Sequence, residues 1–356
     1  MKVGIVGMPN AGKSSLFNAL TKAGADAANY PFTTIEPNVA IVPVRDARLD
    51  AVAKVVGASA IVPDTIAFHD IAGLVRGAHE GEGLGNQFLA NIRETDAIVH
   101  VVRAHTDDNV IHPEGLVDPM RDAETIETEL IFADLDQAER RHQRVVRTAR
   151  SGDKVAIAEE AWLKELIDAL HSGRPARTVP RPKDVPDTLF ALTAKPVLFV
   201  ANVNEGDEEV PAVIAEHAEA QGAKAVAVSA RIEAELSELE DEDAVAMRED
   251  LGVSESGLDR VVHGAFELLG LIAFFTAGED KPAQSWHMRS GLSAWHAAGE
   301  IHSDIQKGFV RAEIIGWQEL VDSGGYAAAR DKGVLRVEGR DYAMRDGDVM
   351  TVKFTP

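Results

Sequence analysis

The stretch GMPNAGKS at residues 7–14 constrains the fold more than any other part of this chain. It follows a short apolar run at residues 3–6 and precedes a helical pattern with apolar side chains on one face. Strand, glycine-rich loop, Lys-Ser and helix form the context in which G-x-x-x-x-G-K-[ST] binds phosphate. The glycines let successive backbone N–H groups point at an anion, beside the positive end of the helix. The sequence therefore predicts a nucleoside triphosphate site.

The residues of this loop have separate expected roles. We expect Lys13 to neutralise the β- and γ-phosphates and so to take part in catalysis. The hydroxyl of Ser14 is expected to ligate Mg²⁺. The predicted phosphate-binding residues are Asn10, Ala11, Gly12, Lys13, Ser14 and Ser15.

Two later segments supply further groups for Mg²⁺ and the γ-phosphate. Residues 28–38 contain two prolines and adjacent threonines, which predicts a loop. Thr34 is expected to close over Mg²⁺ from this loop, and Thr33 is the alternative. A strand then runs into Asp70, whose carboxylate is expected to hold Mg²⁺ through water. The N–H of Gly73, just beyond, is expected to reach the γ-phosphate.

The apolar segments predict a doubly wound α/β sheet interrupted by helices. Buried strands of the parallel kind are expected at residues 97–102, 196–201 and 225–228, with candidate ligands at their carboxyl ends. Helical spacing at residues 124–150 and 155–170, around a short Ser-Gly turn, predicts an antiparallel helical hairpin.

From about Phe274 the chain becomes rich in short apolar runs typical of strands. Near its end, Asp346-Gly347-Asp348 separates two alternating runs, at residues 341–345 and 349–354. A D-G turn in this position predicts a β-hairpin. The last part of the chain is therefore expected to be a separate, β-rich domain.

The charge distribution limits where an anionic partner can bind. The formal charge is −22, and residues 196–273 contain 18 acidic but only 4 basic side chains. We therefore expect no DNA partner for the molecule as a whole. Arg140, Arg144 and Arg147 share one face of the predicted helical hairpin and form the best candidate surface for phosphates.

Composition also bears on the compartment. No apolar run approaches the ~20 residues that a membrane-spanning helix needs, so we expect no membrane association. The chain has no cysteine, and its first residues run directly into a strand, which leaves no room for a signal peptide. These features predict a cytoplasmic protein.

The motifs occur in an order that resembles the YchF group of Obg-related P-loop ATPases. The resemblance is carried by GMPNAGKS, YPFTTIEPN, DIAGLVRGAHEGEGLGNQFLANIRETDAIVHVVR, NVNE, SAR, FFTAGED, IHSDIQKGFVRAEII and EGRDYAMRDGDVM, and it covers nearly the whole chain. It implies a Ras-like P-loop nucleotidase domain, an inserted α-helical coiled-coil hairpin and a C-terminal TGS domain of ubiquitin-like β-grasp fold. The implied limits are residues 1–123 with 196–273, 124–195, and 274–356.

The same resemblance implies an Mg²⁺-dependent switch that hydrolyses ATP and associates with the ribosome or its large subunit. A GTP-hydrolysing Obg-like switch is the alternative, and a nucleotide-binding scaffold without turnover is a third hypothesis. Asn10 resembles the asparagine of potassium-stimulated relatives, although bracing the loop is the interpretation we favour. The chain departs from the group at His69 and at Ala104-His105.

The base-reading motif favours adenine. Guanine-specific relatives have N-K-x-D, in which the Asp accepts from guanine N1–H and the 2-amino group. This chain has NVNE at residues 202–205, so the lysine is lost and the acid is one methylene longer. Asn202 can still pair with adenine through its amide. The predicted base-side residues are Asn202, Val203, Glu205, Ser229 and Ala230.

The residue that activates the attacking water is not the usual one. Ras-like enzymes have a glutamine directly after the D-x-x-G glycine, whereas this chain has Leu74. The resemblance points instead to His112 as the catalytic group, because a neutral imidazole can accept a proton from water. A solvated loop histidine is the alternative interpretation.

Overall fold

The computed structural model describes residues 1–24, 38–71, 84–106, 117–239, 241–250 and 256–355. The chain forms two compact units. The first consists of Met1–Val42 and Ile66–Leu268, and the second of Pro43–Thr65 and Leu269–Pro356. No helix in the described ranges combines the length and apolar composition needed to cross a bilayer.

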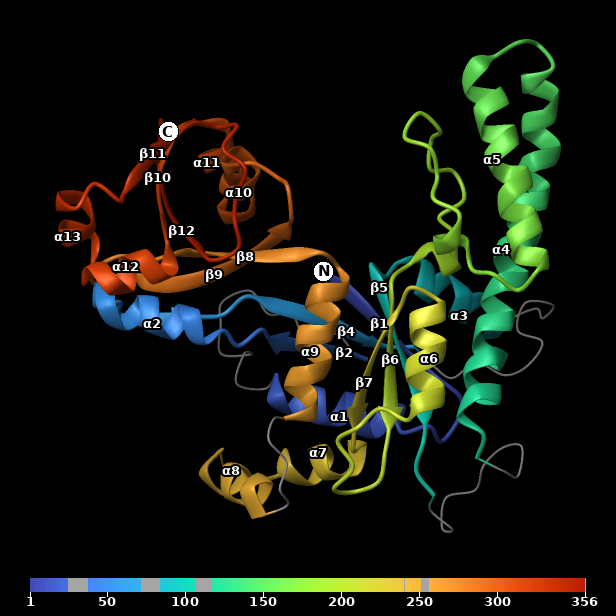
Figure 1. Cartoon of the computed structure of the whole chain (residues 1–356), viewed down its shortest axis with the longest axis horizontal. Coiled ribbons are helices and arrows are strands. Elements are labelled where there is room, and N and C mark those ends of the chain that lie inside the picture. Colours follow the sequence, from blue (N-terminus) through green and yellow to red (C-terminus); the bar gives the residue numbers. More distant parts are fainter. Residues whose placement is uncertain (25–37, 72–83, 107–116, 240, 251–255, 356) are drawn as a thin grey trace. The chain divides into compact units, whose positions relative to one another are not determined.

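The first unit is built on a six-stranded sheet with the order β2-β4-β1-β5-β6-β7 (Figure 1). Its strands are β1 (Lys2–Val6), β2 (Val39–Pro43), β4 (Thr65–Asp70), β5 (Ala97–Arg103), β6 (Val197–Asn202) and β7 (Lys224–Val228). The pairs β4–β1, β1–β5, β5–β6 and β6–β7 are all parallel. Their carboxyl ends therefore lie along one edge, as the α/β prediction requires.

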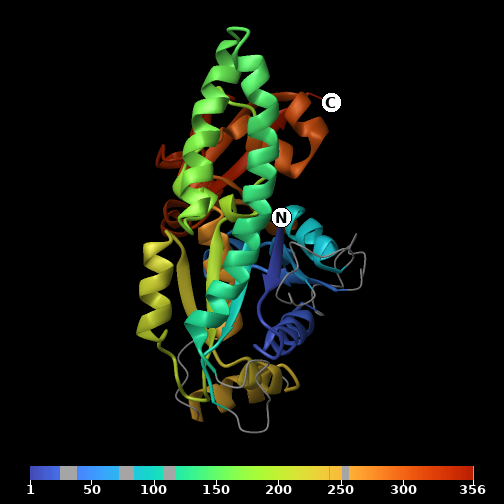
Figure 2. The ribbon, with the colours of Figure 1, turned by 90° about the vertical axis from the view of Figure 1, so that its right-hand side faces the viewer.

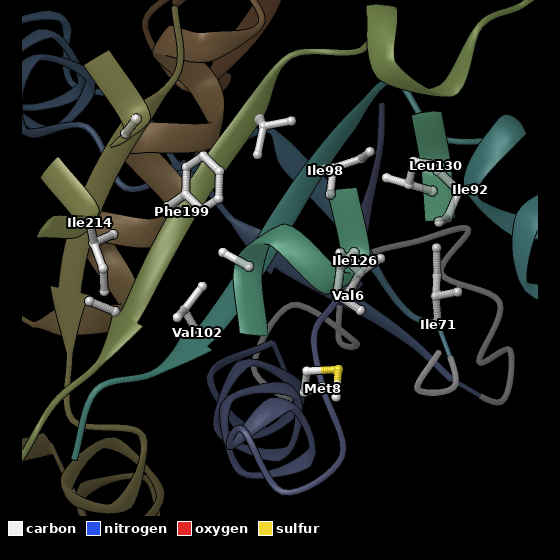
Figure 3. Close-up of a cluster of buried hydrophobic side chains, with 14 of the residues drawn as sticks. Val6, Met8, Ile71, Ile92, Ile98, Val102, Ile126, Leu130, Phe199 and Ile214 are labelled. Carbon is white, nitrogen blue, oxygen red and sulfur yellow. The ribbon is translucent and has the colours of Figure 1, made fainter. Parts of the chain in front are cut away.

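Helices cover both faces of this sheet. The helices around it are α1 (Lys13–Ala23), α3 (Leu84–Arg93), α6 (Ala212–Ala220), α7 (Ala230–Leu236), α8 (Asp241–Asp250) and α9 (Gly257–Leu268). Phe199 on β6 packs in one core with Ile126 and Ile214 (Figure 3). The next residue back, Leu198, contacts Gly264 of α9 instead. Since successive strand residues point to opposite faces, α9 lies on the face opposite α6.

A long helical hairpin interrupts the sheet between β5 and β6. It consists of α4 (Pro119–Ala149) and α5 (Lys154–His171), which lie side by side in both views (Figures 1 and 2). The carboxylates of Asp118 and Asp153 cap the two helices by accepting from Arg121 and Ala156 backbone N–H groups. The hairpin prediction is confirmed.

The helix α4 belongs to two cores, which the predicted limit at residue 124 did not anticipate. Its first half places Ala123, Ile126 and Leu130 in the core of the sheet. Its second half packs Ala138 and Val145 against α5. The hairpin is thus a continuation of a helix that is already part of the sheet's packing.

The second unit contains a mixed six-stranded sheet with the order β11-β10-β12-β8-β9-β3. Its strands are β3 (Ala60–Val62), β8 (Leu271–Thr276), β9 (Pro282–Arg289), β10 (Phe309–Gly316), β11 (Arg336–Glu338) and β12 (Asp348–Phe354). Its helices are α2 (Ala47–Val56), α10 (Ala294–Ile301), α11 (Ser303–Lys307), α12 (Trp317–Ser323) and α13 (Tyr326–Asp331). The core beneath α10 contains Phe274, Ile314 and Met350.

The predicted hairpin around Gly347 is wrong. Residues 341–345 form no strand, and β12 pairs with β10 (antiparallel) and β8 (parallel) instead. The carboxylates of the DGD sequence explain the difference. Asp346 accepts from the backbone N–H of Ala273 at 2.9 Å, and Asp348 accepts from that of Arg345 at 2.9 Å. These bonds tie the turn to β8 and fold the preceding segment into a loop.

Residues 43–65 belong to the second unit, whereas the sequence prediction placed them in the nucleotide domain. The strand β3 pairs in parallel with β9, with Ala60 opposite Pro282. The side chain of Asp64 accepts from the backbone N–H of His287 at 3.0 Å. Since these partners lie far away in the sequence, local patterns could not have assigned this segment.

Candidate nucleotide-binding site

A cleft of about 1140 Å³ lies at the carboxyl edge of the parallel sheet. Its walls are formed by the GMPNAGKS loop, the segments that follow β5 and β6, and α7 with the turn before it. Its lining residues are Asn10, Gly12, Lys13, Ser14, Ser15, His105, Thr106, Asn202, Val203, Asn204, Glu205, Ser229, Ala230, Arg231, Ala234, Glu235 and Glu238. The fold therefore gathers most of the predicted phosphate-side and base-side residues around one hollow.

The glycine loop is shaped for a close backbone approach. Gly12 has φ +100°, and a Cβ there would lie 2.2 Å from Nδ2 of Asn202. Only glycine satisfies both conditions. Gly12 also precedes α1 without a side-chain cap, so the N–H groups of the first turn are available to an anion. Asn10, which also lines the cleft, is in the left-handed region with φ 63°.

Lys13 lines the cleft, and Asp70 at the end of β4 is close enough to interact with it electrostatically. Lys13 is buried, and its Nζ donates to the carbonyl of Met8 at 2.8 Å. Burial lowers the pKa of Lys13, and the nearby carboxylate of Asp70 partly opposes this change. Burial likewise raises the pKa of Asp70, and Lys13 opposes it. Lys13 lacks much of the water it would have at the surface, so a phosphate beside it would be favoured.

Asn202 holds three segments of the cleft together, a role that the sequence did not indicate. Its Nδ2 donates to the carbonyl of Ala11, and its Oδ1 accepts from the N–H of Ala230, both at 3.0 Å. Asn202 itself is buried at the end of β6. The amide thus fixes the phosphate loop against the start of α7. Its expected contact with adenine stays a prediction.

The neighbouring base-side residues differ in what they offer a ligand. Val203 is buried, and its N–H donates to the carbonyl of Val228 at 3.0 Å. Ser229 caps α7, since its hydroxyl accepts from the N–H of Ile232. Glu205 has a half-exposed side chain that pairs with Arg231 at 3.2 Å. Of these side chains, Glu205 is the one with a charge at the wall of the cleft.

Three predicted residues, Thr34, Gly73 and His112, lie outside the described residues. Conversely, sequence reasoning did not assign His105, Thr106 or any α7 residue beyond Ala230 to the cleft. A signal was present for the first two, because they directly follow the buried strand that ends at Arg103. The α7 residues after Ala230 lacked such a signal, apart from Arg231, which ends the SAR motif of the family resemblance.

The comparisons with known proteins identify the family. The chain is 49% identical over 359 residues to the Ribosome-binding ATPase YchF of Haemophilus ducreyi, and the match covers 99% of both chains. The chain belongs to the YchF family. The protein of the same name from Bacillus subtilis is 47% identical over 364 residues, again with 99% of both chains covered.

Solved structures and family models agree with this assignment. The Schizosaccharomyces pombe YchF GTPase matches with a TM-score of 0.88 and 35% identity, covering 99% of this chain and 97% of that one. The YchF-GTPase_C model, described as a protein of unknown function, matches residues 271–355. A model described as a 50S ribosome-binding GTPase matches residues 2–134. The YchF relatives are thus named both ATPases and GTPases.

Proposed function

We propose that the chain is an Mg²⁺-dependent switch that binds and hydrolyses ATP and associates with the ribosome. The observation that carries the nucleotide preference is the base side of the cleft. Val203 is buried where a guanine site needs a lysine, and the carboxylate of Glu205 is paired with Arg231. Neither residue supports guanine recognition. The names of the curated YchF relatives support the same function.

Titration with nucleotide analogues tests this preference against the alternative, a GTPase switch. We expect AMPPNP to bind at least about tenfold more tightly than GMPPNP. A tenfold difference in affinity corresponds to about 1.4 kcal/mol of binding free energy. The physical reason is the missing acceptor for guanine N1–H and the 2-amino group, because each hydrogen bond to a charged group contributes roughly 1.5–3 kcal/mol. Isothermal titration in Mg²⁺ buffer would measure both affinities. Equal or tighter GMPPNP binding would favour the GTPase.

The donor set of the site fits Mg²⁺. Ser14 supplies a hydroxyl at the start of α1, and Asp70 a carboxylate at the end of β4, beside Lys13. Hard oxygen donors in small number suit Mg²⁺, which keeps several water ligands and also binds the nucleotide phosphates. Thr34 completes the proposed set. When bound, the ion would neutralise the charge that develops on the phosphates during hydrolysis.

Hydrolysis would distinguish a switch from a scaffold. We assign water activation to His112, because Leu74 offers no hydrogen bond at the usual glutamine position. The γ-phosphate would be held by Lys13 and the N–H of Gly73. Release of phosphate from ATP by the purified protein would exclude a scaffold without turnover.

The ribosome-facing surface is proposed on α4. Arg144 and Arg147 are exposed, and neither forms an ion pair with any part of the chain that the structure describes. Arg140 belongs to the same face but pairs with Asp136 at 2.9 Å. Arg141, next to it, is committed to the buried carboxylate of Glu159 at 2.7 Å. The unpaired charges make Arg144 and Arg147 the main phosphate contacts, with Arg140 beside them.

Charge reversal on this face should weaken ribosome binding. We expect the double variant Arg144→Glu, Arg147→Glu to lose at least about tenfold in affinity, and its slope of log affinity against log salt to fall by about 1 to 2. Cosedimentation with ribosomes at several salt concentrations measures both. Lys164→Glu is the matched control, because Lys164 lies on α5 of the same hairpin and is exposed and paired with Glu160. Unchanged binding, with ATP hydrolysis intact, would exclude this surface.

A ribosomal partner agrees with a cytoplasmic location, which we include in the proposal. The three-part division into a nucleotide domain, a helical insertion and a TGS domain is also retained, with residues 43–65 moved to the last part.

A further inference from the structure

Glu205 lies where a guanine-specific cleft needs a free carboxylate. It follows β6 by three residues, and β6 ends at Asn202, whose amide is bound to both Ala11 and Ala230. The backbone on either side of the cleft is therefore fixed, and Glu205 projects from this fixed frame into the cleft wall. What its carboxylate contacts depends mainly on its own side-chain conformation.

Arg231 contacts this carboxylate. It lies in the first turn of α7, directly after Ala230. Its Nε is 3.2 Å from Oε1 of Glu205 and 3.1 Å from Oε1 of Glu235. All three side chains line the same cleft. One guanidinium thus lies between two carboxylates, and one of them belongs to the base-reading motif.

We propose that Arg231 is a specificity-determining residue, which disfavours GTP by holding the carboxylate of Glu205 away from the base. It acts through Glu205 and is therefore a positioning residue. This inference rests on the proposed preference for ATP and adds a cause to it, since the extra methylene of Glu205 alone leaves the side chain able to turn toward the ligand.

The chemistry of the two bases explains the expected asymmetry. Guanine presents two donors, N1–H and the 2-amino group, to a carboxylate. Adenine presents the lone pair of N1 at the same edge and has no 2-amino group, so a free carboxylate offers it nothing. Releasing Glu205 should therefore strengthen GTP binding and leave ATP binding almost unchanged. Because Arg231 and Glu205 have exposed side chains, at 72% and 50%, their ion pair is weak and removable.

The test uses the full-length protein with AMPPNP and GMPPNP. We expect Arg231→Ala to increase GMPPNP affinity about fivefold while AMPPNP affinity changes less than about twofold. Adding Glu205→Gln to Arg231→Ala should abolish the gain, because the neutral amide lacks the second acceptor. Arg231→Lys keeps a cation beside Glu205 and should retain the wild-type ratio. Glu235→Gln, which removes the charge of a different partner of Arg231, is the matched control and should also retain it.

The outcomes separate this inference from the proposed function. A wild-type preference for GMPPNP contradicts the proposed function, whatever the variants do. An unchanged ratio in Arg231→Ala contradicts the inference and leaves the ATP preference standing. Equal loss of both analogues in Arg231→Ala, or a gain that survives Glu205→Gln, also overturns it. Thermal unfolding of each variant excludes a loss of fold as the cause.

Discussion

Replacing Lys13 by alanine should weaken ATP binding by at least about 100-fold and reduce hydrolysis with it. Two phosphates would lose a charged donor, and hydrogen bonds to charged groups contribute roughly 1.5–3 kcal/mol each. Burial adds to the effect. It lowers the pKa of Lys13 because the buried ammonium group has lost water, and a bound phosphate would stabilise that charge. Titration with AMPPNP and a steady-state phosphate-release assay measure the two losses.

A variant at a second lysine makes this result specific. Lys22→Ala is the matched control, because Lys22 lies on the same helix α1 but is exposed and paired with Glu238. It should leave ATP binding nearly unchanged.

His112→Ala should lower turnover with ATP affinity intact, if His112 activates water. Normal ATP binding by Lys13→Ala would contradict the proposed phosphate site, and normal turnover by His112→Ala would remove that residue from the mechanism.

The sequence could predict the phosphate site because every requirement there is local. The turn needs glycine at position 12, where φ is +100°. The strand before the loop and the helix after it also follow from short-range patterns. The base-side residues could be predicted at the same site because they follow parallel strands, and the carboxyl ends of parallel strands lie along one edge of the sheet.

The failures concern contacts between segments that are distant in the sequence. The turn at Gly347 has the local chemistry of a hairpin, yet Asp346 bonds to Ala273 instead. Residues 43–65 carry no sign that β3 will pair with β9. The bracing role of Asn202 was missed for the same reason, because Ala11 lies 191 positions earlier in the chain.

A group of polar side chains lies where α4 meets the sheet and α6, with His100 buried and Glu127, Arg177 and His217 partly buried. His100 on β5 is fully enclosed and lies beside the ring of Phe199, with a centroid distance of 5.2 Å. Glu127 of α4 binds His217 of α6 at 2.9 Å. Arg177 donates to the backbone and side chain of Gln221. The bond between Glu127 and His217 joins α4 to α6, and both histidines lie against the ring of Phe199, so their protonation affects the stability of this packing.

The two histidines respond to pH in opposite directions. Burial lowers the pKa of His100 to about 4, while Glu127 opposes this and His217, Lys13 and Arg177 add to it. Its stabilising contribution is therefore complete above the unfolded pKa near 6.5 and is lost as the pH falls toward 4. The hydrogen bond to Glu127 raises the pKa of His217. The contribution of His217 is complete below about pH 6.5 and is lost only as the pH rises through its folded pKa.

Between pH 7 and pH 5, the titration of His100 should therefore lower the free energy of unfolding by about 2 kcal/mol. We expect His100→Phe, which cannot titrate, to lose about 2 kcal/mol less than the wild type over this interval. Urea unfolding at the two pH values measures the difference, and the effect of carboxylates that titrate in both proteins cancels in this comparison.

His100→Asn provides a second neutral variant if phenylalanine packs poorly. His217→Gln is the control of opposite sign, because it removes a contribution that is present at pH 5. Equal acid sensitivity of the wild type and both His100 variants would show that His100 accepts a proton in the folded state as readily as in the unfolded chain.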